Sequence, residues 1–359
     1  MKRANKLFPI LISDENLSQA IDEVNRTHRW GRHHRPNQCV QWIERTKPER
    51  IIDLRNMILN GFEPSPARHR TIYDKSSSKY REIYEPKLWP DQYIHHALIQ
   101  VIQAPIMRGM DHWCCGSIPN RGTAHGIEGI KRWMKEDRRG TKYCAELDIH
   151  HFYQSLRPEI VMAQMRTIIK DIYVLDMIER ILKDGVPIGN YCSQWFANAV
   201  LQPLDHMIRE KLGVSHYIRY MDNFTLFSNN KKKLHKAVRE IEKWLQTRGM
   251  QLKSNWQVFP VSSRLPNAMG YRYGRGYTLA RKKIVLRLKR SCRRVEKRIA
   301  QGREPTGRQA AAILSRVGWL CHCNGQNIRR QCLTPIGEKR LKDTVRKWAQ
   351  NRQVRCVTN

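Results

Sequence analysis

The segment Val214–Phe227, VSHYIRYMDNFTLF, carries the clearest structural signal in this chain. Apolar and aromatic residues alternate up to Tyr220 and resume at Phe224, with the letters MDN between them. Two short alternating runs that flank a polar break predict a β-hairpin with an exposed tip. The hairpin is therefore expected to present Asp222 on a rigid turn.

A second carboxylate follows another predicted strand. Residues 142–156, KYCAELDIHHFYQSL, alternate in hydrophobicity through Leu147 and reach Asp148 where the strand is expected to end. Two carboxylates at strand ends can hold two divalent ions about 3.5–4 Å apart, and hard oxygen ligands suit Mg²⁺. A lone Asp is more often a turn or cap residue, so only the pairing of Asp148 with Asp222 indicates metal-dependent phosphoryl chemistry.

The charge of the chain narrows the class of partner. Lys and Arg number 66 against 32 Asp and Glu, which gives a formal net charge of +34. Residues 281–359 alone contain 22 basic and four acidic residues, a net charge of +18. Such an excess is typical of a protein that binds a polyanion, and a generally basic, solvated surface is the alternative.

Length and cysteine usage set broader limits. A chain of 359 residues allows about two domains or one large fold of several parts. Its ten cysteines are scattered, and the N-terminus lacks the apolar run of a secretory signal, so we expect a reduced, cytoplasmic protein. The longest uncharged run, 185–204, is interrupted by Pro, Gly, Asn and Gln and is a poor membrane span. The thiols of 321–332 lack the paired CxxC spacing of zinc sites, which favours free thiols on a helical face.

Several other segments have a recognisable local pattern. Helices are expected over 13–30, around Val40 and Ile43, from Pro48 to the Asn60-Gly61 stop, and over 91–107 and 116–134. Residues 68–84 predict a second hairpin, with a Ser-rich turn and basic residues on both arms. It is suited to hold a triphosphate, or it is an ordinary solvated hairpin.

Two further helical segments carry more specific expectations. In 185–204 a Gly-Pro-Gly loop leads into a helix near Ser193, whose small residues would allow another backbone or a nucleic acid to approach, although its composition also fits a buried core helix. In 281–359, apolar residues at spacings of three and four predict a helix with one apolar stripe and a cationic face that would grip a duplex backbone. Thr306 to Gln309 predict a capping box for the next helix, and the chain after about 330 predicts a tail or a partner-docking helix.

Three motifs together resemble those of a known family. DIHHFYQS at 148–155, GVPIGNYCSQ at 185–194 and YMDN at 220–223 resemble successive motifs of reverse transcriptases, in the same order. The resemblance extends to KYREIYEPKLWPDQYIHHAL (79–98), AMGY (268–271) and VGWLCHCNG (317–325), and so covers roughly residues 60–330. It implies an α+β right-hand polymerase fold with fingers, a palm built on an antiparallel sheet, and a helical thumb. The expected domains are an N-terminal helical extension (1–62), fingers and palm (63–275), and a basic helical thumb with a C-terminal tail (276–359).

The resemblance implies an RNA-directed DNA polymerase, that is, a nucleotidyltransferase that makes cDNA. The IGNYCSQ variant is similar to the reverse transcriptases of diversity-generating retroelements, which copy a structured template RNA with errors at adenines. The implied partners are template RNA, cDNA and deoxynucleotides, with an accessory protein or a second copy in a ribonucleoprotein, and no membrane. Two alternatives remain open: an antiphage defence reverse transcriptase of related lineage, and a catalytically impaired RNA-binding relative.

The resemblance also assigns roles to residues. Asp148 and Asp222 would hold two Mg²⁺ ions, with Mn²⁺ as an alternative, and the Ile149 carbonyl would be a further ligand; Asn223 completes the catalytic set. Tyr153 would exclude a 2′-hydroxyl. Contacts with the nucleotide are implied for Lys79, Arg81, Arg121, Phe152, Tyr153, Ile188, Gly189, Gln194 and Lys253. Contacts with nucleic acid are implied for Arg287, Arg290, Arg294, Arg298 and Trp319.

Three positions depart from the pattern of most relatives. Asn223 stands where the family usually has a second acid, which removes one negative charge beside the metals. Ile188 replaces a Gln that would hydrogen-bond the incoming nucleotide, which motivates a low-fidelity hypothesis. Lys253 is the only base in 249–259, where relatives usually have one or two Lys after Leu-Asn. A proton-donating role is therefore not carried over to Lys253.

Overall fold

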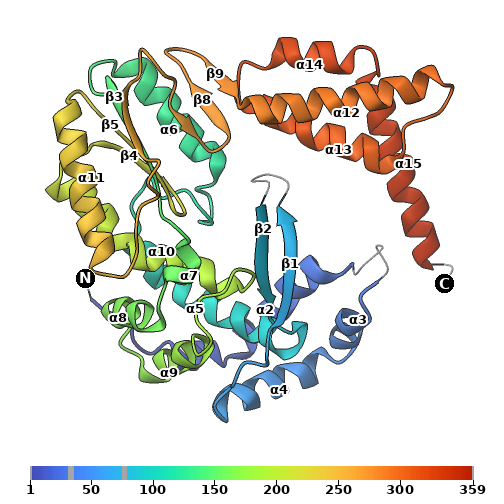
Figure 1. Ribbon diagram of the computed structural model, residues 1–359. Helices are drawn as coiled ribbons and strands as arrows, with labels where there is room; N and C mark the ends of the chain where they lie inside the picture. The colour runs from blue at the N-terminus through green and yellow to red at the C-terminus, as the bar shows by residue number, and fades with distance from the viewer. Residues whose placement is uncertain (1, 31–35, 75–78, 358–359) are drawn as a thin grey trace. The chain divides into compact units, whose positions relative to one another are not determined.

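A computed structural model of the chain describes residues 2–30, 36–74 and 79–357 (Figure 1). The chain folds into two compact units, each built from several segments of the sequence. The first unit comprises Met1–Ser117, Asp148–Gly213 and Ala237–Asn255, and the second comprises Ile118–Leu147, Val214–Lys236 and Trp256–Asn359.

Helices make up most of the first unit, together with one β-hairpin. Its elements in chain order are α1 (Phe8–Leu11), α2 (Asp14–His28), α3 (Gln38–Arg45), α4 (Lys47–Leu59), β1 (Arg68–Asp74), β2 (Lys79–Glu85), the π-helical turn η2 (Leu88–Gln92), α5 (Tyr93–Arg108), α7 (Phe152–Ser155), α8 (Pro158–Ile168), α9 (Ile172–Ile181), α10 (Tyr191–His206) and η3 (Met207–Lys211). The helix α11 (Lys231–Gln246) continues into this unit from the second.

The centre of the first unit is formed by α5 and α10. Both helices are apolar on nearly all sides and buried along most of their length, as expected of core helices. Ala197 and Ala199 are fully buried, so the small residues of α10 pack against protein, and the core-helix interpretation of 185–204 is correct. The helix expected at 91–107 is preceded by the turn η2, because Trp89 precedes Pro90 and has non-helical backbone angles (φ −105°, ψ 131°).

One carboxylate, that of Asp171, organises the start of the chain. Its Oδ2 accepts hydrogen bonds from the backbone N–H groups of Leu7 (2.8 Å) and Phe8 (3.0 Å). Its Oδ1 accepts the N–H of Val174 (3.3 Å) and thereby caps α9. Asp171 thus satisfies backbone donors of two helices that are far apart in sequence.

The hairpin of β1 and β2 pairs in antiparallel register from Arg68 opposite Glu85 to Asp74 opposite Lys79, which confirms the predicted hairpin. Its Ser-rich turn lies outside the described residues. The N–H of Tyr84 on β2 donates to the carbonyl of Ile188 (2.8 Å), so the loop before α10 is hydrogen-bonded to the hairpin.

Gly189 allows this close approach. Its φ is +111°, and a Cβ at this position would lie 2.6 Å from Ile83 Cγ2 and 2.7 Å from the Tyr84 carbonyl oxygen. No larger residue fits without displacing β2 or the loop.

The second unit is built on two sheets. A four-stranded sheet has the order β4-β5-β3-β6, formed by β4 (His216–Tyr220), β5 (Asn223–Ser228), β3 (Tyr143–Asp148) and β6 (Gln257–Pro260). A three-stranded antiparallel sheet contains β7 (Asn267–Ala268), β8 (Tyr271–Tyr273) and β9 (Thr278–Ala280). The hairpin predicted at 214–227 and the strand predicted to end at Asp148 are both confirmed.

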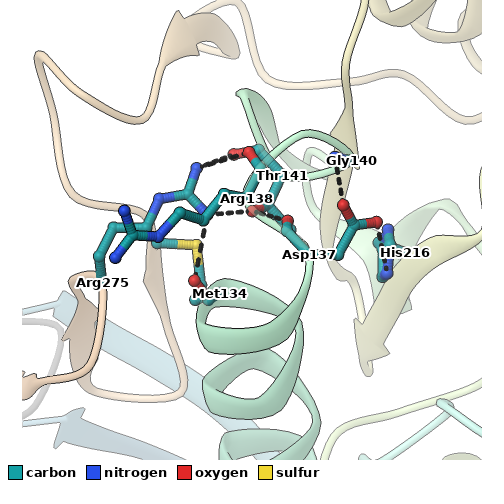
Figure 2. Close-up of polar contacts among 7 residues, drawn as sticks. All are labelled: Met134, Asp137, Arg138, Gly140, Thr141, His216 and Arg275. Atoms are coloured by element: carbon teal, nitrogen blue, oxygen red, sulfur yellow. Dashed lines mark hydrogen bonds and ion pairs between the residues drawn. The ribbon is translucent and has the colours of Figure 1, made fainter.

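Arg275, in the turn between β8 and β9, joins the small sheet to the end of α6 (Thr123–Glu136), as Figure 2 shows. Its Nη1 donates to the Met134 carbonyl (3.1 Å) and to Thr141 Oγ1 (2.5 Å), and its Nη2 donates to the carbonyls of Arg138 (3.0 Å) and Thr141 (3.1 Å). Burial lowers the pKa of this guanidinium. The carbonyls at the C-terminal end of a helix lack partners within the helix, and Arg275 supplies donors to them.

The loop after α6 also contacts β4. Asp137 Oδ1 accepts the N–H of Gly140 (2.7 Å), and its Oδ2 lies 3.7 Å from His216 Nε2 at the start of β4 (Figure 2). Arg275 and Asp137 therefore attach the small sheet and β4 to the same loop.

The C-terminal part of the second unit is helical. It contains α12 (Lys282–Ala300), α13 (Gly307–Gly318), the 3₁₀ turn η4 (Trp319–His322), α14 (Gln326–Leu333) and α15 (Glu338–Val357). Leu288, Cys292 and Val295 of α12 are buried in one cluster with residues of the other helices, which confirms the predicted apolar stripe. The predicted capping box is present, since Thr306 Oγ1 accepts the Gln309 N–H (3.3 Å) and Gln309 Oε1 accepts the Thr306 N–H (3.0 Å).

Within the described residues, no helix combines the length and apolar character that crossing a bilayer requires.

Candidate active site

The turn that carries Asp222 is short and tightly held. Tyr220 of β4 pairs with Asn223 of β5, so Met221 and Asp222 alone connect the two strands. Met221 has a positive φ of 55°, a strained conformation for a residue with a side chain. Arg219 is fully buried, and its Nη1 donates a hydrogen bond to the Met221 carbonyl (3.1 Å), which supports the turn from the buried side.

Asn223 acts directly on the predicted metal ligand. Its Nδ2 donates a hydrogen bond to Asp222 Oδ1 (2.9 Å). The amide therefore orients the Asp222 carboxylate but contributes no charge of its own. The turn presents one negative charge, where two acids would present two.

Asp148 is the last residue of β3, and the segment 251–253 runs beside it in the first unit. The Lys253 N–H donates to the Asp148 carbonyl (2.8 Å) and the His150 N–H donates to the Gln251 carbonyl (2.8 Å). Ile149 forms an antiparallel bridge with Leu252. These backbone contacts fix Lys253 next to Asp148.

The side chains of Asp148 and Lys253 form an ion pair. Lys253 Nζ lies 2.5 Å from Asp148 Oδ2. The Asp148 side chain is 30% exposed and the Lys253 side chain is 35% exposed. The other carboxylate oxygen, Oδ1, is buried and has no hydrogen-bond partner in the described structure. A buried carboxylate oxygen without a partner is costly, and a hard cation satisfies it. Asp148 thus fits a divalent ion at Oδ1.

β5, which follows Asp222 in the chain, is the neighbour of β3, which ends at Asp148. Within the described part of the chain, this site included, no group of three or more His, Cys, Asp or Glu side chains is arranged to hold a metal ion.

Most of the residues predicted to contact a nucleotide lie on elements of the first unit. Arg81 on β2 forms an ion pair with Asp74 across the hairpin (Nε to Oδ2, 3.0 Å). Ile188 is half-buried, Gly189 is exposed in the same loop, and Gln194 is exposed on α10. The backbone of Lys79 begins β2, and its side chain lies outside the described residues.

Two further predicted contacts follow Asp148 on the short helix α7. Phe152 is buried, with 3% of its surface exposed, whereas Tyr153 is half-buried. Their rings lie 5.6 Å apart. Tyr153 is therefore the more accessible of the two side chains. Arg121 belongs to the second unit, where it is half-buried two residues before α6 begins.

Four of the five predicted nucleic-acid contacts lie on α12, and the fifth, Trp319, begins η4. Arg287, Arg290, Arg294 and Arg298 recur at spacings of three and four, and Arg290 and Arg294 are exposed. Arg298 donates through Nε to the Glu304 carbonyl (2.7 Å). Trp319 is 41% exposed and its ring lies 5.8 Å from that of Tyr271, directly over Gly270.

Sequence reasoning missed Arg219, the buried support of the Asp222 turn. A signal was present, because an arginine in the middle of the alternating run HYIRY is unusual for a buried strand. Sequence reasoning also missed the ion pair between Asp148 and Lys253, which no local pattern indicates.

A family model described as "Reverse transcriptase (RNA-dependent DNA polymerase)" matches residues 74–260. No curated protein sequence matches the chain.

Solved structures of similar fold include telomerases of two Candida species. Apo telomerase from Candida tropicalis has a TM-score of 0.50 at 10% identity, covering 82% of this chain and 59% of that chain. A C-terminally truncated apo form from the same species has a TM-score of 0.45 at 14% identity, covering 60% of this chain and 54% of that chain. Telomerase from Candida albicans with a fragment of telomeric RNA has a TM-score of 0.45 at 13% identity, covering 64% and 51%. The chain spans about half the length of these telomerases.

Proposed function

Because the chain belongs to the reverse transcriptase (RNA-dependent DNA polymerase) family, we propose that it is an active RNA-directed DNA polymerase that makes cDNA from a template RNA. The family model covers 187 of 359 residues, and the mixed helical and sheet fold is that of right-hand polymerases. The observation that carries the proposal is the buried, unpartnered Oδ1 of Asp148 at the end of the strand next to β5.

The chemistry would be a two-metal nucleotidyl transfer. Asp148, Asp222 and the Ile149 carbonyl would hold the two divalent ions, which when bound activate the primer 3′-hydroxyl and neutralise charge on the leaving pyrophosphate. Arg81 and Lys79 would donate charge-assisted hydrogen bonds to the triphosphate. Tyr153 would pack against the sugar and leave no space for a 2′-hydroxyl.

Lys253 would balance the charge at Asp148. Its ammonium is held on Asp148 Oδ2 by the backbone pairing of 251–253, so it neutralises a carboxylate that is partly removed from water. Asn223 would keep Asp222 in one orientation through its amide hydrogen bond. We propose Mg²⁺ as the ion, since the donor set consists of hard oxygens.

The decisive experiment is deoxynucleotide incorporation on an RNA template with Mg²⁺ or Mn²⁺, comparing wild type with Asp222→Ala. Loss of one metal-holding carboxylate is expected to lower the rate at least about 100-fold. Asp22→Ala is the matched control, because Asp22 is an exposed Asp of α2 whose partner is Lys47. Incorporation that survives in Asp222→Ala would remove the proposed site. If wild type binds RNA but incorporates nothing with either metal, Asn223 favours the catalytically impaired RNA-binding relative.

A finer proposal concerns the biological role, for which we favour low-fidelity copying in a diversity-generating retroelement. This role is supported by Ile188, which lies in the loop that precedes α10 and is hydrogen-bonded to β2. Its half-buried side chain has no group that could hydrogen-bond a nucleotide. Misincorporation at template adenines above that at other bases is expected, and Ile188→Gln is expected to reduce it. Uniform accuracy at all four bases would exclude this role, and repetitive cDNA would favour antiphage defence.

We also propose how the parts of the chain divide the work. Residues 63–275 would supply fingers and palm, and 276–359 a thumb whose α12 arginines hold the phosphates of template and cDNA without reading sequence. Residues 1–62 would be an N-terminal extension. Assembly with an accessory protein or a second copy, and action in the cytoplasm, belong to the same proposal.

A further inference from the structure

Two aromatic rings are stacked next to the loop that precedes α10. Tyr191 is the first residue of α10, directly after Asn190, which caps the helix by accepting the Cys192 N–H (2.9 Å). The ring of Tyr191 lies on that of His96 of α5, with centroids 3.9 Å apart and planes inclined by 4°. Both residues belong to the first unit.

Tyr191 is the outer member of this pair. Tyr191 is 37% exposed, whereas His96 is half-buried. Burial lowers the pKa of His96 to about 4, so the imidazole is neutral near pH 7. The pKa of Tyr191 is raised by burial, against a hydrogen bond with the side chain of Trp195 one turn further along the helix. The Tyr191 side chain is therefore uncharged, and it is held both by stacking on His96 and by the hydrogen bond with Trp195.

The backbone before Tyr191 is equally restrained. The Ile188 carbonyl accepts the Tyr84 N–H, and Gly189 lies against β2 with no space for a Cβ. Only two residues separate Ile188, which has no polar side-chain atom, from the exposed ring of Tyr191 at the start of α10. This juxtaposition offers stacking where a hydrogen-bonding side chain is missing.

We propose that Tyr191, backed by His96, is a stacking platform for a nucleobase during cDNA synthesis. The base is either an unpaired base of the template or the base of the incoming nucleotide. Because every base has an aromatic face, stacking holds a base without reading its hydrogen-bonding edge. The inference rests on the proposed function and extends it by naming a residue that contacts the base.

The test measures thermodynamic coupling between Tyr191 and each base of the template. Binding of the wild type and of Tyr191→Ala is measured on primer–template duplexes with a single-stranded overhang, in which an abasic site replaces one overhang position at a time. Stacking of one base on an aromatic ring corresponds to about 5- to 150-fold in affinity. At the position that stacks, the abasic site and Tyr191→Ala are each expected to weaken binding within this range, and their combination no further.

A second arm measures the kinetics of each of the four nucleotides. If the incoming base is the one that stacks, Tyr191→Ala raises KM for all four by a similar factor and leaves kcat nearly unchanged. Tyr191→Phe retains the ring and is expected to behave as wild type in both arms. Tyr173→Ala is the matched control, since Tyr173 is a 62% exposed tyrosine of α9 in the same unit.

The outcomes decide the proposal. Coupling at one template position assigns the template base, and a uniform rise in KM assigns the incoming base. Additive losses at every overhang position together with unchanged KM would overturn it. If Tyr191→Ala does not fold, Tyr191→Leu keeps apolar bulk without an aromatic face and takes its place. Because the binding arm needs no turnover, failure of the polymerase itself is seen separately, as bound template without extension.

Discussion

At the scale of single residues, Asn223 is the most informative difference from the family pattern. Its amide contributes a hydrogen bond to Asp222 and no charge. Asn223→Asp adds a carboxylate to the turn, and one additional nearby charge is worth about 1 kcal/mol at a partly exposed site, or roughly fivefold in ion affinity. The Mg²⁺ concentration that gives half-maximal incorporation is therefore expected to fall about fivefold.

The control for this substitution is Asn229→Asp. Asn229 is an exposed asparagine just beyond the end of β5, so the change adds the same charge away from the turn. A shift of the Mg²⁺ titration in both variants would show that total charge is responsible. No shift in Asn223→Asp would mean that residue 223 does not take part in holding the ion.

Tyr153 allows a second prediction at this scale. The ring is half-buried on α7, two residues after His151, which has a positive φ of 45°. Its position relative to Asp148 is therefore fixed by a short, constrained segment. Tyr153→Val removes the ring and is expected to raise incorporation of ribonucleotides relative to deoxynucleotides by about tenfold or more. Tyr153→Phe keeps the ring and is expected to retain the wild-type ratio. Competition between a ribonucleotide and its deoxynucleotide on one template measures this incorporation ratio. Equal ratios in wild type, Tyr153→Val and Tyr153→Phe would contradict the prediction.

At the scale of secondary-structure elements, the contact between β2 and the loop before α10 can be tested with two glycines. Gly189 and Gly185 both have positive φ, +111° and +92°, but only at Gly189 would a Cβ meet other atoms. An Ala at either position adds backbone strain of about 1 kcal/mol. Gly189→Ala is expected to lower the free energy of unfolding by a further 1–3 kcal/mol or so, because β2 must move. Equal losses in denaturant unfolding would show that the loop and hairpin do not touch in solution.

The cationic face of α12 permits a prediction about salt. Arg290 and Arg294 are exposed, and each phosphate that they neutralise releases counterions. Replacing both by Gln is expected to reduce the slope of log K against log salt concentration by about two for an RNA–DNA duplex. The control, Arg26→Gln with Lys183→Gln, removes two exposed cations outside α12. An equal change of slope in both double variants would mean that the total charge of the protein, and not the face of α12, determines the salt dependence of binding.

The sequence predicted those elements whose patterns are local. The hairpins, the strand that ends at Asp148, and α12 with its stripe could all be recognised because each is determined by neighbouring residues. By contrast, α8 and α9 were not predicted, and the burial of α10 could not be decided from composition, since an apolar helix is compatible with either a core or an interface.

The candidate site was predictable only in part. Asp148 and Asp222 follow from strand ends and motif resemblance. The contact of Lys253 with Asp148 depends on backbone pairing between segments 105 residues apart. The stacking of Tyr191 on His96 depends on the packing of α10 against α5. Such contacts arise from tertiary packing, which local sequence patterns do not encode.

At the scale of the whole molecule, a buried histidine is expected to limit stability in acid. His95 is 1% exposed, neither ring nitrogen has a hydrogen-bond partner in the described structure, and burial lowers its pKa to about 4. The unfolded chain, with a pKa near 6.5, binds this proton more readily. The free energy of unfolding should therefore fall as pH decreases from about 6.5 to 4, by about 3 kcal/mol at most from this group.

The variant His95→Phe isolates this contribution. It removes the titrating group and places an apolar ring where His95 already contacts the ring of Phe62 (centroids 6.3 Å). Denaturant unfolding at a series of pH values is expected to show a shallower decline for the variant below pH 6.5. Parallel curves for the two proteins would mean that His95 is protonated equally in the folded and unfolded chains.

The hydrogen bonds of Arg275 have a consequence for how the second unit opens. The turn between β8 and β9 contains Gly274 and Gly276 and is hydrogen-bonded, through the guanidinium of Arg275, to Met134, Arg138 and Thr141. Backbone amides of this turn and of the loop after α6 should consequently exchange with solvent as one cooperative group, although more than 130 residues separate them. Lysine has no planar fork of donors, so Arg275→Lys cannot reproduce the bonds that couple the two segments.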